Sequence, residues 1–200
     1  MFNSVKKIPR YGFNFLISNK GIKARIFQRI FKKMTIIPYK WRLHMGQSRY
    51  PYYHYCVYQA AVLAKQLNYS SISVFEFGCA KGNGLRELEK ISLEIKKIMG
   101  IEIEVYGFDT GEGLPAPEGI RDLKHCWKEG DFKMDRTNTV FKYAKLVLGN
   151  ISDTKIDFFE KYKPAPVGAV FFDFDYYSST KEGMDLLLHD ESKYLPRVYS

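Results

Sequence analysis

Four predicted strands of this chain each end in a side chain that can accept hydrogen bonds. These side chains are Glu76, Asp109, Asn150 and Asp173, and each follows or closes an apolar run. Carboxylates accept hydrogen bonds, attract cations and take up protons. In parallel sheets, ligands bind beyond the carboxyl ends of the strands. The four residues therefore predict a binding site along one edge of a sheet.

A glycine-rich segment follows Glu76. Residues 78–84 read Gly-Cys-Ala-Lys-Gly-Asn-Gly. Between a strand and a helix, such a segment offers backbone N–H groups and a helix N-terminus to a nucleotide. Glu76 would repel a pyrophosphate but suits an adenosine that carries a cationic amino-acid tail and no phosphate. S-adenosylmethionine (SAM) is such a ligand, so we predict a methyl-donor site that includes Glu76, Gly78, Ala80 and Gly82.

Asp109 is predicted to accept hydrogen bonds from the ribose hydroxyls, because a carboxylate offers only acceptors. Thr110 and Asn150 complete the predicted cofactor site. Ala80 stands where a glycine is expected, and it fits there if its φ is negative. Ordinary structural roles stay open for three residues: an ion pair of Glu76 with Lys81 or Arg86, a turn cap by Asp109 before Gly111, and a Gly149-Asn150 turn.

Two aspartates flank a single residue after the fourth predicted strand. Residues 172–180 read Phe-Asp-Phe-Asp-Tyr-Tyr-Ser-Ser-Thr. Asp173 and Asp175 suit a hard cation, or one suits a cation while the other serves as a general base. The alternative is that Asp175 or a following serine caps a helix that begins near Thr180.

The hydrophobic pattern predicts strands that alternate with helices. We expect helices over 52–68, 85–99 and 157–162, and strands over 71–77, 103–108, 144–148 and 168–172, with 197–199 opening a fifth strand. This alternation predicts an α/β fold with a Rossmann-like, doubly wound, mostly parallel sheet. Residues 110–143 show little regular pattern. Because long loops are often functional, we expect this segment to cover the substrate.

Positive charge is concentrated at the N-terminus. The net charge is +9, and the first 75 residues hold thirteen Lys and Arg but no Asp or Glu. We therefore divide the chain into a basic arm (1–50) and a SAM-binding domain (51–200). Within the arm, Ile22, Ile26 and Ile30 recur at helical spacing, which predicts an amphipathic basic helix. It would pack on the domain or form a dimer, or it would contact an anionic membrane surface. No nucleic-acid partner is expected, because no RNA-binding signature accompanies the charge.

Composition favours a folded protein inside the cell. The chain has 200 residues, of which 46% are hydrophobic, so one domain with a substantial core is expected. Cys56, Cys79 and Cys126 are scattered and form no metal-binding pair, so we expect reduced thiols and a cytoplasmic location. No apolar run approaches the roughly 20 residues of a membrane span.

Four segments together resemble a known class of enzymes. They are residues 76–84, 106–115 (Tyr-Gly-Phe-Asp-Thr-Gly-Glu-Gly-Leu-Pro), 145–150 (Lys-Leu-Val-Leu-Gly-Asn) and 172–180. They resemble class I SAM-dependent methyltransferases, and within these the macrocin O-methyltransferase-like (TylF-like) proteins and their uncharacterised bacterial relatives. The resemblance runs from about Tyr50 to the end of the chain. It implies O-methylation of a hydroxyl on a sugar or another small molecule.

The resemblance also implies roles for single residues. SAM would bind at the glycine-rich segment and at Asp109. Asp173 would hold Mg²⁺ together with an acidic pair after the fifth strand, and Asp175 would be the base that deprotonates the acceptor hydroxyl. The chain ends at Ser200, where that fifth strand begins. We therefore expect a domain that lacks its C-terminal part and an incomplete metal site.

Three other classes of protein are weighed against this interpretation. A nicotinamide-dependent dehydrogenase would place an acid about 20 residues after its glycines, whereas Asp109 follows Gly78 by 31 residues. A metal-dependent glycosyltransferase would use Asp173 and Asp175 to hold a nucleotide sugar, but it leaves residues 76–84 without a role. A non-catalytic SAM-binding or membrane-surface adaptor would depend mainly on the basic arm.

Overall fold

A computed structural model describes residues 39, 50–137, 139–188 and 190–200 of the chain. The basic arm predicted over residues 1–50, including its amphipathic helix, lies outside the described residues except for Tyr39 and Tyr50. Among the helices that the structure describes, none combines the length and the apolar character needed to cross a membrane.

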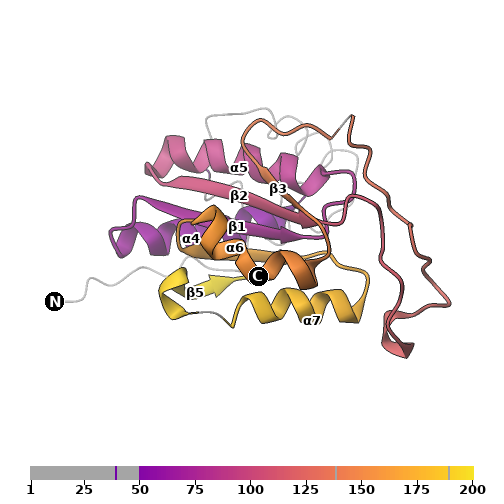
Figure 1. Ribbon diagram of the computed structural model, residues 1–200. Helices are drawn as coiled ribbons and strands as arrows, with labels where there is room; N and C mark the ends of the chain where they lie inside the picture. The colour runs from indigo at the N-terminus through magenta and orange to yellow at the C-terminus, as the bar shows by residue number, and fades with distance from the viewer. Residues whose placement is uncertain (1–38, 40–49, 138, 189) are drawn as a thin grey trace, which may run out of the picture. The chain divides into compact units, whose positions relative to one another are not determined.

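A five-stranded parallel sheet forms the centre of residues 50–200 (Figure 1). Its strands are β1 (Ser71–Phe77), β2 (Glu102–Asp109), β3 (Lys145–Leu148), β4 (Val167–Phe172) and β5 (Tyr194–Tyr199). Their order is β3-β2-β1-β4-β5, and every neighbouring pair is parallel. The predicted α/β, Rossmann-like fold is confirmed. The sheet reverses its winding between β1 and β4, which is where such sheets bind ligands.

The register of the sheet brings the predicted site residues together. Phe77 at the end of β1 pairs with Phe108 of β2 and with Phe172 of β4. Asp109 and Asp173 directly follow these two partners in the chain, and the glycine-rich segment directly follows Phe77. Three of the predicted polar strand ends therefore lie next to one another at the carboxyl edge.

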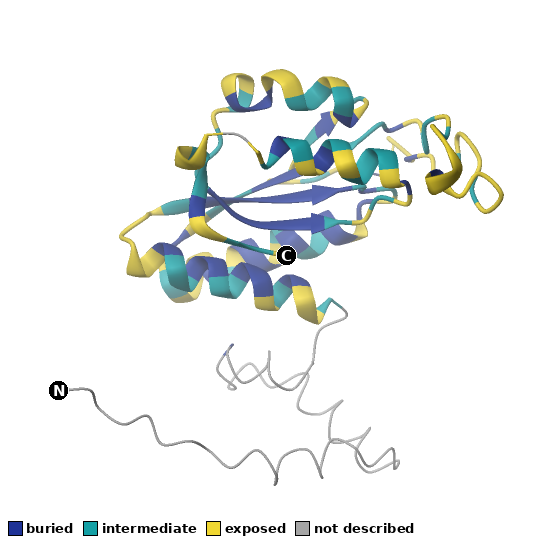
Figure 2. Ribbon diagram, turned by 90° about the horizontal axis from the view of Figure 1, so that it is seen from below, coloured by how far each residue is buried: buried dark blue, intermediate teal, exposed yellow. Residues whose placement is uncertain are grey.

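Two pairs of helices cover the sheet, as Figure 2 shows with exposed residues on their outer sides. The helices are α4 (Pro51–Gln66), α5 (Asn83–Met99), α6 (Ile151–Tyr162) and α7 (Tyr177–Leu186). α4 contacts α5, and α6 contacts α7. α5 forms because four of its apolar residues recur at helical spacing on the buried face: Leu85, Leu88, Ile91 and Ile95.

Aromatic rings make up most of the core beneath α6. Phe75 and Phe77 of β1 pack with Phe108 of β2, and Phe158 of α6 meets Phe75 edge to face at 5.2 Å between ring centroids. Such rings bury a large apolar area each, so this cluster fixes α6 against the sheet. Glu76 lies between the two β1 phenylalanines in sequence, and its side chain therefore points to the opposite face, toward α4.

Three elements begin three or more residues before their predicted starts. α6 begins at Ile151, six residues before the predicted helix, because the Asn150 side chain caps it by accepting from the Ser152 N–H (3.3 Å). α7 begins at Tyr177 instead of near Thr180, and β5 begins at Tyr194 instead of 197.

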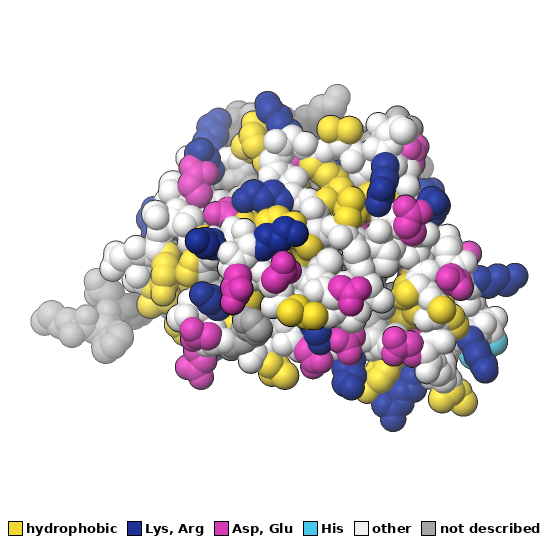
Figure 3. Space-filling view, viewed as in Figure 1, with side chains coloured by type: hydrophobic (Ala, Val, Ile, Leu, Met, Phe, Trp, Pro, Cys, Tyr) yellow, Lys and Arg dark blue, Asp and Glu magenta, His cyan; other side chains and the backbone are white. Residues whose placement is uncertain are grey.

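The surface in Figure 3 mixes Lys and Arg with Asp, Glu and apolar side chains, with no single type gathered over α6 and α7.

Candidate functional site

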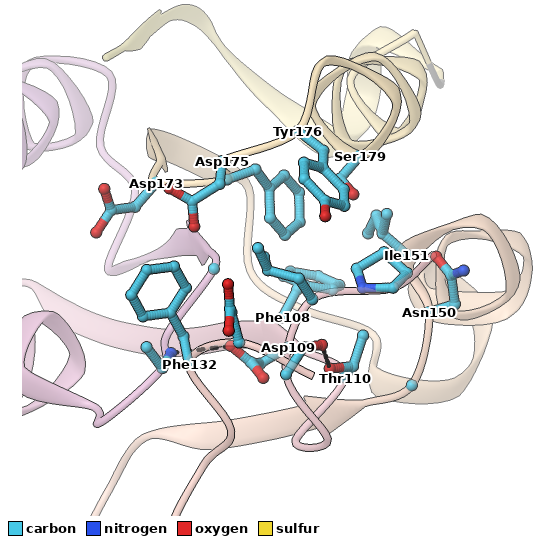
Figure 4. A pocket seen from close by; sticks show the side chains of 18 residues that line it. Phe108, Asp109, Thr110, Phe132, Asn150, Ile151, Asp173, Asp175, Tyr176 and Ser179 are labelled. Atoms are coloured by element: carbon cyan, nitrogen blue, oxygen red, sulfur yellow. Dashed lines mark hydrogen bonds between the residues drawn. The ribbon is translucent and has the colours of Figure 1, made fainter. Parts of the chain in front are cut away.

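A pocket of about 260 Å³ lies beyond the carboxyl edge of the sheet (Figure 4). Residues from the ends of β1, β2, β3 and β4 line one side of it. They are Gly78, Ala80, Phe108, Asp109, Thr110, Gly149, Asn150, Ile151, Asp173, Phe174 and Asp175. Seven predicted site residues are thus brought into one pocket. Glu76 and Gly82, which were also predicted, do not line it.

Asp109 holds the glycine-rich segment in place. Its Oδ2 accepts hydrogen bonds from the N–H groups of Cys79 (2.8 Å) and Ala80 (2.9 Å), and its Oδ1 accepts from the Gly111 N–H (2.7 Å). The turn cap before Gly111, which was the alternative role of Asp109, is therefore present. The same carboxylate also links the end of β2 to the residues that follow β1. A carboxylate has about four acceptor positions, so one remains for a ligand. The ribose contact stays a prediction.

Ala80 departs from the expected conformation. Its φ is +43°, in the left-handed region, whereas we expected a negative φ. The two N–H groups directed at Asp109 account for the difference, because the backbone must turn both of them toward one carboxylate. An L-residue in this region is strained relative to glycine. The segment therefore contains strain at a residue that lines the pocket.

Gly78 brings the two strand ends into direct contact. Its φ is +85°, and a Cβ built on it would lie 2.5 Å from the carbonyl oxygen of Asp173. Only glycine permits both the conformation and the close approach. The start of the glycine-rich segment is consequently packed against the backbone that carries Asp173 and Asp175.

Glu76 is buried behind the pocket. It is 2% exposed, its Oε1 accepts from the Tyr53 hydroxyl (2.6 Å), and its Oε2 has no hydrogen-bond partner among the described residues. Burial raises the pKa of Glu76 to about 8; the Tyr53 hydrogen bond works against this rise, and Asp173 and Asp109 add to it. Glu76 does not form the alternative ion pair with Lys81 or Arg86, because its side chain is bound by the Tyr53 hydroxyl instead.

Glu76 also explains a second glycine of the segment. A Cβ at Gly84 would lie 1.8 Å from Glu76 Oε1, so any side chain at this position would displace the carboxyl group. Glu76 therefore packs under the first turn of α5 and supports the segment from behind. Its predicted role as a direct cofactor contact stays untested.

Asp173 and Asp175 both line the pocket on the α7 side (Figure 4). Burial, and then the neighbouring Asp173, raise the pKa of Asp175 above its ordinary value. A raised pKa suits a carboxylate that must take up a proton near neutral pH. Neither Asp175 nor a following serine caps α7, so the capping alternative is wrong: the Ser178 N–H at the start of α7 donates to Asp122 (2.9 Å).

The segment 110–143 supplies the opposite side of the pocket. Gly113, Leu114, Pro115, Asp131 and Phe132 line it. Two backbone hydrogen bonds hold these stretches together, from the Leu114 N–H to the Asp131 carbonyl (2.8 Å) and from the Gly130 N–H to the Leu114 carbonyl (2.9 Å). These stretches therefore form one wall of the pocket, with Phe132 opposite the aspartates (Figure 4).

Two residues that are not among the predicted site residues also shape this site. Asp122 is 1% exposed, and it joins the segment 110–143 to α7 through the Ser178 N–H (2.9 Å) and the Ser178 hydroxyl (2.8 Å). Tyr176 lines the pocket and is 1% exposed. Neither has a local sequence signal, because Asp122 acts on a residue 56 positions later in the chain and Tyr176 lies in a run of aromatic residues.

The pocket is acidic. Its side chains include the carboxylates of Asp109, Asp131, Asp173 and Asp175, and none of its lining residues is Lys, Arg or His. Within the described residues, no group of three or more His, Cys, Asp or Glu side chains is placed to hold a metal ion. Asp173 and Asp175 therefore do not by themselves form the predicted Mg²⁺ site.

Comparisons with known proteins give a likeness in structure alone. No family model and no curated protein matches the chain. The structure of CalS11, described as a calicheamicin methyltransferase, matches with 16% identity and a TM-score of 0.49 over 84% of this chain and 74% of that one. The apo structure of CalS11, described as TDP-rhamnose 3′-O-methyltransferase, matches with 18% identity and a TM-score of 0.41 over 84% and 73%. Likeness at this level assigns no activity to this chain, and the TylF-like resemblance stays a prediction.

Proposed function

We propose that this chain is a SAM-dependent methyltransferase that transfers a methyl group to a hydroxyl of a sugar or another small molecule. The observation that carries the proposal is the charge of the pocket. Four aspartates line it, and no basic side chain among the described residues does. A ligand with a sulfonium and an ammonium group gains from these carboxylates, whereas a ligand with phosphates is repelled by them.

The acidic pocket and the contacts of Asp109 also argue against a dehydrogenase and a glycosyltransferase. NAD and a nucleotide sugar each carry a diphosphate, and such groups are normally bound by helix N-termini, basic side chains or a metal ion. Asp109 already occupies the Cys79 and Ala80 N–H groups of the glycine-rich segment, which a diphosphate would need. A cofactor without phosphate leaves these hydrogen bonds intact.

The pocket also provides for the chemistry of methyl transfer. Displacement at a sulfonium requires the acceptor oxygen to approach in line, so much of the catalysis is alignment of two ligands. Asp175 is the proposed base that removes the proton of the acceptor hydroxyl, and its raised pKa fits that role. The segment 110–143 would exclude water once both ligands are bound. Mg²⁺ remains a prediction of the resemblance, and the proposal needs no metal step.

Isothermal titration calorimetry with SAM, S-adenosylhomocysteine, NAD and a UDP-sugar tests the proposal. We expect binding of the two S-adenosyl ligands and no binding of the other two. Asp109→Ala should weaken SAM binding by an amount on the order of 1.5–3 kcal/mol, as for hydrogen bonds to a charged group. Asp157→Ala is the matched control, because Asp157 is exposed on α6 and does not line the pocket. Tight NAD binding, or equal SAM affinity in the Asp109 and Asp157 variants, would contradict the proposal.

A further inference from the structure

Tyr176 has a buried hydroxyl group without a hydrogen-bond partner. The residue is 1% exposed, and its hydroxyl oxygen is one of three buried side-chain oxygens that lack a partner among the described residues. Leaving a buried hydroxyl unpaired is costly, so such a group calls for a specific explanation. Unlike the other two, Ser73 and Glu76, Tyr176 lines the pocket.

Hydrogen bonds of the residues that follow Tyr176 hold its backbone at the start of α7. After it, the Thr180 N–H and hydroxyl both donate to the Tyr176 carbonyl (3.0 and 2.9 Å). The Asp122 carboxylate accepts from the Ser178 N–H (2.9 Å) and also from the Glu118 N–H (2.8 Å). Because its backbone is held in this way and the residue is almost fully buried, Tyr176 is positioned before any ligand arrives. Preorganisation of this kind lowers the entropy cost of a later contact.

The surroundings of the hydroxyl indicate what it would meet. Figure 4 shows it directed into the pocket at the end that holds Ser179, Ile151 and Asn150, while Asp173 and Asp175 lie toward the other end. The first end carries uncharged polar and apolar groups, and the second carries carboxylates. Burial, followed by the charge of Asp122, raises the pKa of Tyr176, so its hydroxyl keeps its proton and remains a donor.

We propose that the Tyr176 hydroxyl donates a hydrogen bond to the uncharged nucleoside part of the ligand in this pocket. This inference rests on the proposed function, since it takes the ligand to be SAM or S-adenosylhomocysteine. The nucleoside carries neutral nitrogen and oxygen acceptors, while the cationic tail matches the aspartates at the other end of the pocket. Tyr176 is thus a binding residue whose partner is supplied by the ligand.

The test compares Tyr176→Phe with Tyr177→Phe in the full chain. Tyr177 is the matched control, because its hydroxyl accepts from Arg121 (2.9 Å) and it does not line the pocket. Calorimetry with S-adenosylhomocysteine and with adenosine should show affinities about three- to tenfold weaker for Tyr176→Phe and unchanged for Tyr177→Phe, the size expected for one neutral hydrogen bond. Thermal unfolding without ligand should show that Tyr176→Phe is at least as stable as the wild type, because the change removes an unpaired polar group.

Each other result overturns the inference in a recognisable way. Equal affinity of wild type and Tyr176→Phe would show that the ligand does not use the hydroxyl. Weaker binding together with lower ligand-free stability would make the hydroxyl a structural group. Loss of affinity in Tyr177→Phe as well would show that the effect is not specific to the pocket. A wild-type chain that binds neither S-adenosylhomocysteine nor adenosine would remove the proposed function itself, and that failure is visible without any variant.

Discussion

Ala80 lines the candidate site in a strained backbone conformation. Its φ of +43° is enforced by two backbone hydrogen bonds to Asp109. We expect Ala80→Gly to raise the free energy of unfolding by about 0.5–1 kcal/mol, because glycine adopts this conformation without strain while losing more chain entropy on folding. Urea denaturation measures the change. Ala64→Gly inside α4 is the control and should lower the same quantity by at least about 1 kcal/mol, because it also removes a buried methyl group. Destabilisation by both variants would mean that the Ala80 methyl group matters more for packing than for strain.

Glu76 predicts a pH dependence of stability. Its folded-state pKa is raised to about 8 from an ordinary 4.5. Between these pH values the folded chain keeps a proton that the unfolded chain has lost, so stability falls as pH rises through this window. Glu76→Gln keeps an acceptor for the Tyr53 hydroxyl and has no charge to bury. The variant should therefore gain stability over the wild type as pH rises, by a few kcal/mol at about 1.4 kcal/mol per pKa unit.

Urea unfolding at pH 5 and pH 9 measures this difference for Glu76→Gln. Glu160→Gln, at an exposed position on α6, is the control and should show no pH-dependent difference from the wild type. A constant offset between Glu76→Gln and the wild type at both pH values would mean that Glu76 is not protonated in the folded chain.

Elements with local signals were predicted well, and elements with distant partners were not. The β1 strand matches its predicted bounds. Every residue after Ser71 is buried, and all of them except Ser73 and Glu76 are apolar, so the strand is visible in the sequence as a short apolar run. The start of α6 was missed because its first turn is polar and depends on the Asn150 cap. The start of α7 could not be predicted from nearby sequence, because the carboxylate that accepts from the Ser178 N–H comes from Asp122, 56 residues earlier.

The contact between Asp122 and α7 leads to a prediction about that element. Asp122→Ala leaves the N–H groups of Glu118 and Ser178 without their buried acceptor, so we expect unfolding free energy to fall by about 1–3 kcal/mol. Ser178→Ala removes only the hydroxyl contact and should cost less. The double variant should show a coupling energy of at least about 0.5 kcal/mol in a double-mutant cycle. Strictly additive losses would mean that the two side chains do not act together.

At the scale of the whole molecule, parallel strands explain why the sequence located most of the site. Asp109, Asn150 and Asp173 share one pocket because each lies at or just after the carboxyl end of its strand. Glu76 lies within β1, where alternation turns its side chain to the face covered by α4, so a polar residue near a strand end was not enough to place it in the pocket. Tyr176 depends on how α7 and the segment 110–143 pack, and that information is spread over the chain.

The acidic pocket predicts which ligands stabilise the folded molecule. A ligand that binds only the folded state at 100 times its Kd adds about 2.7 kcal/mol to the free energy of unfolding. For a chain of this length, that corresponds to a rise in Tm of roughly 5–10 °C. Differential scanning calorimetry should show this rise with S-adenosylhomocysteine and none with NAD at the same concentration. The rise should persist in Asp157→Ala and shrink in Asp109→Ala, because only Asp109 lines the pocket and holds its glycine-rich segment. Equal rises with both ligands, or a rise that Asp109→Ala leaves intact, would place the binding site elsewhere on the molecule.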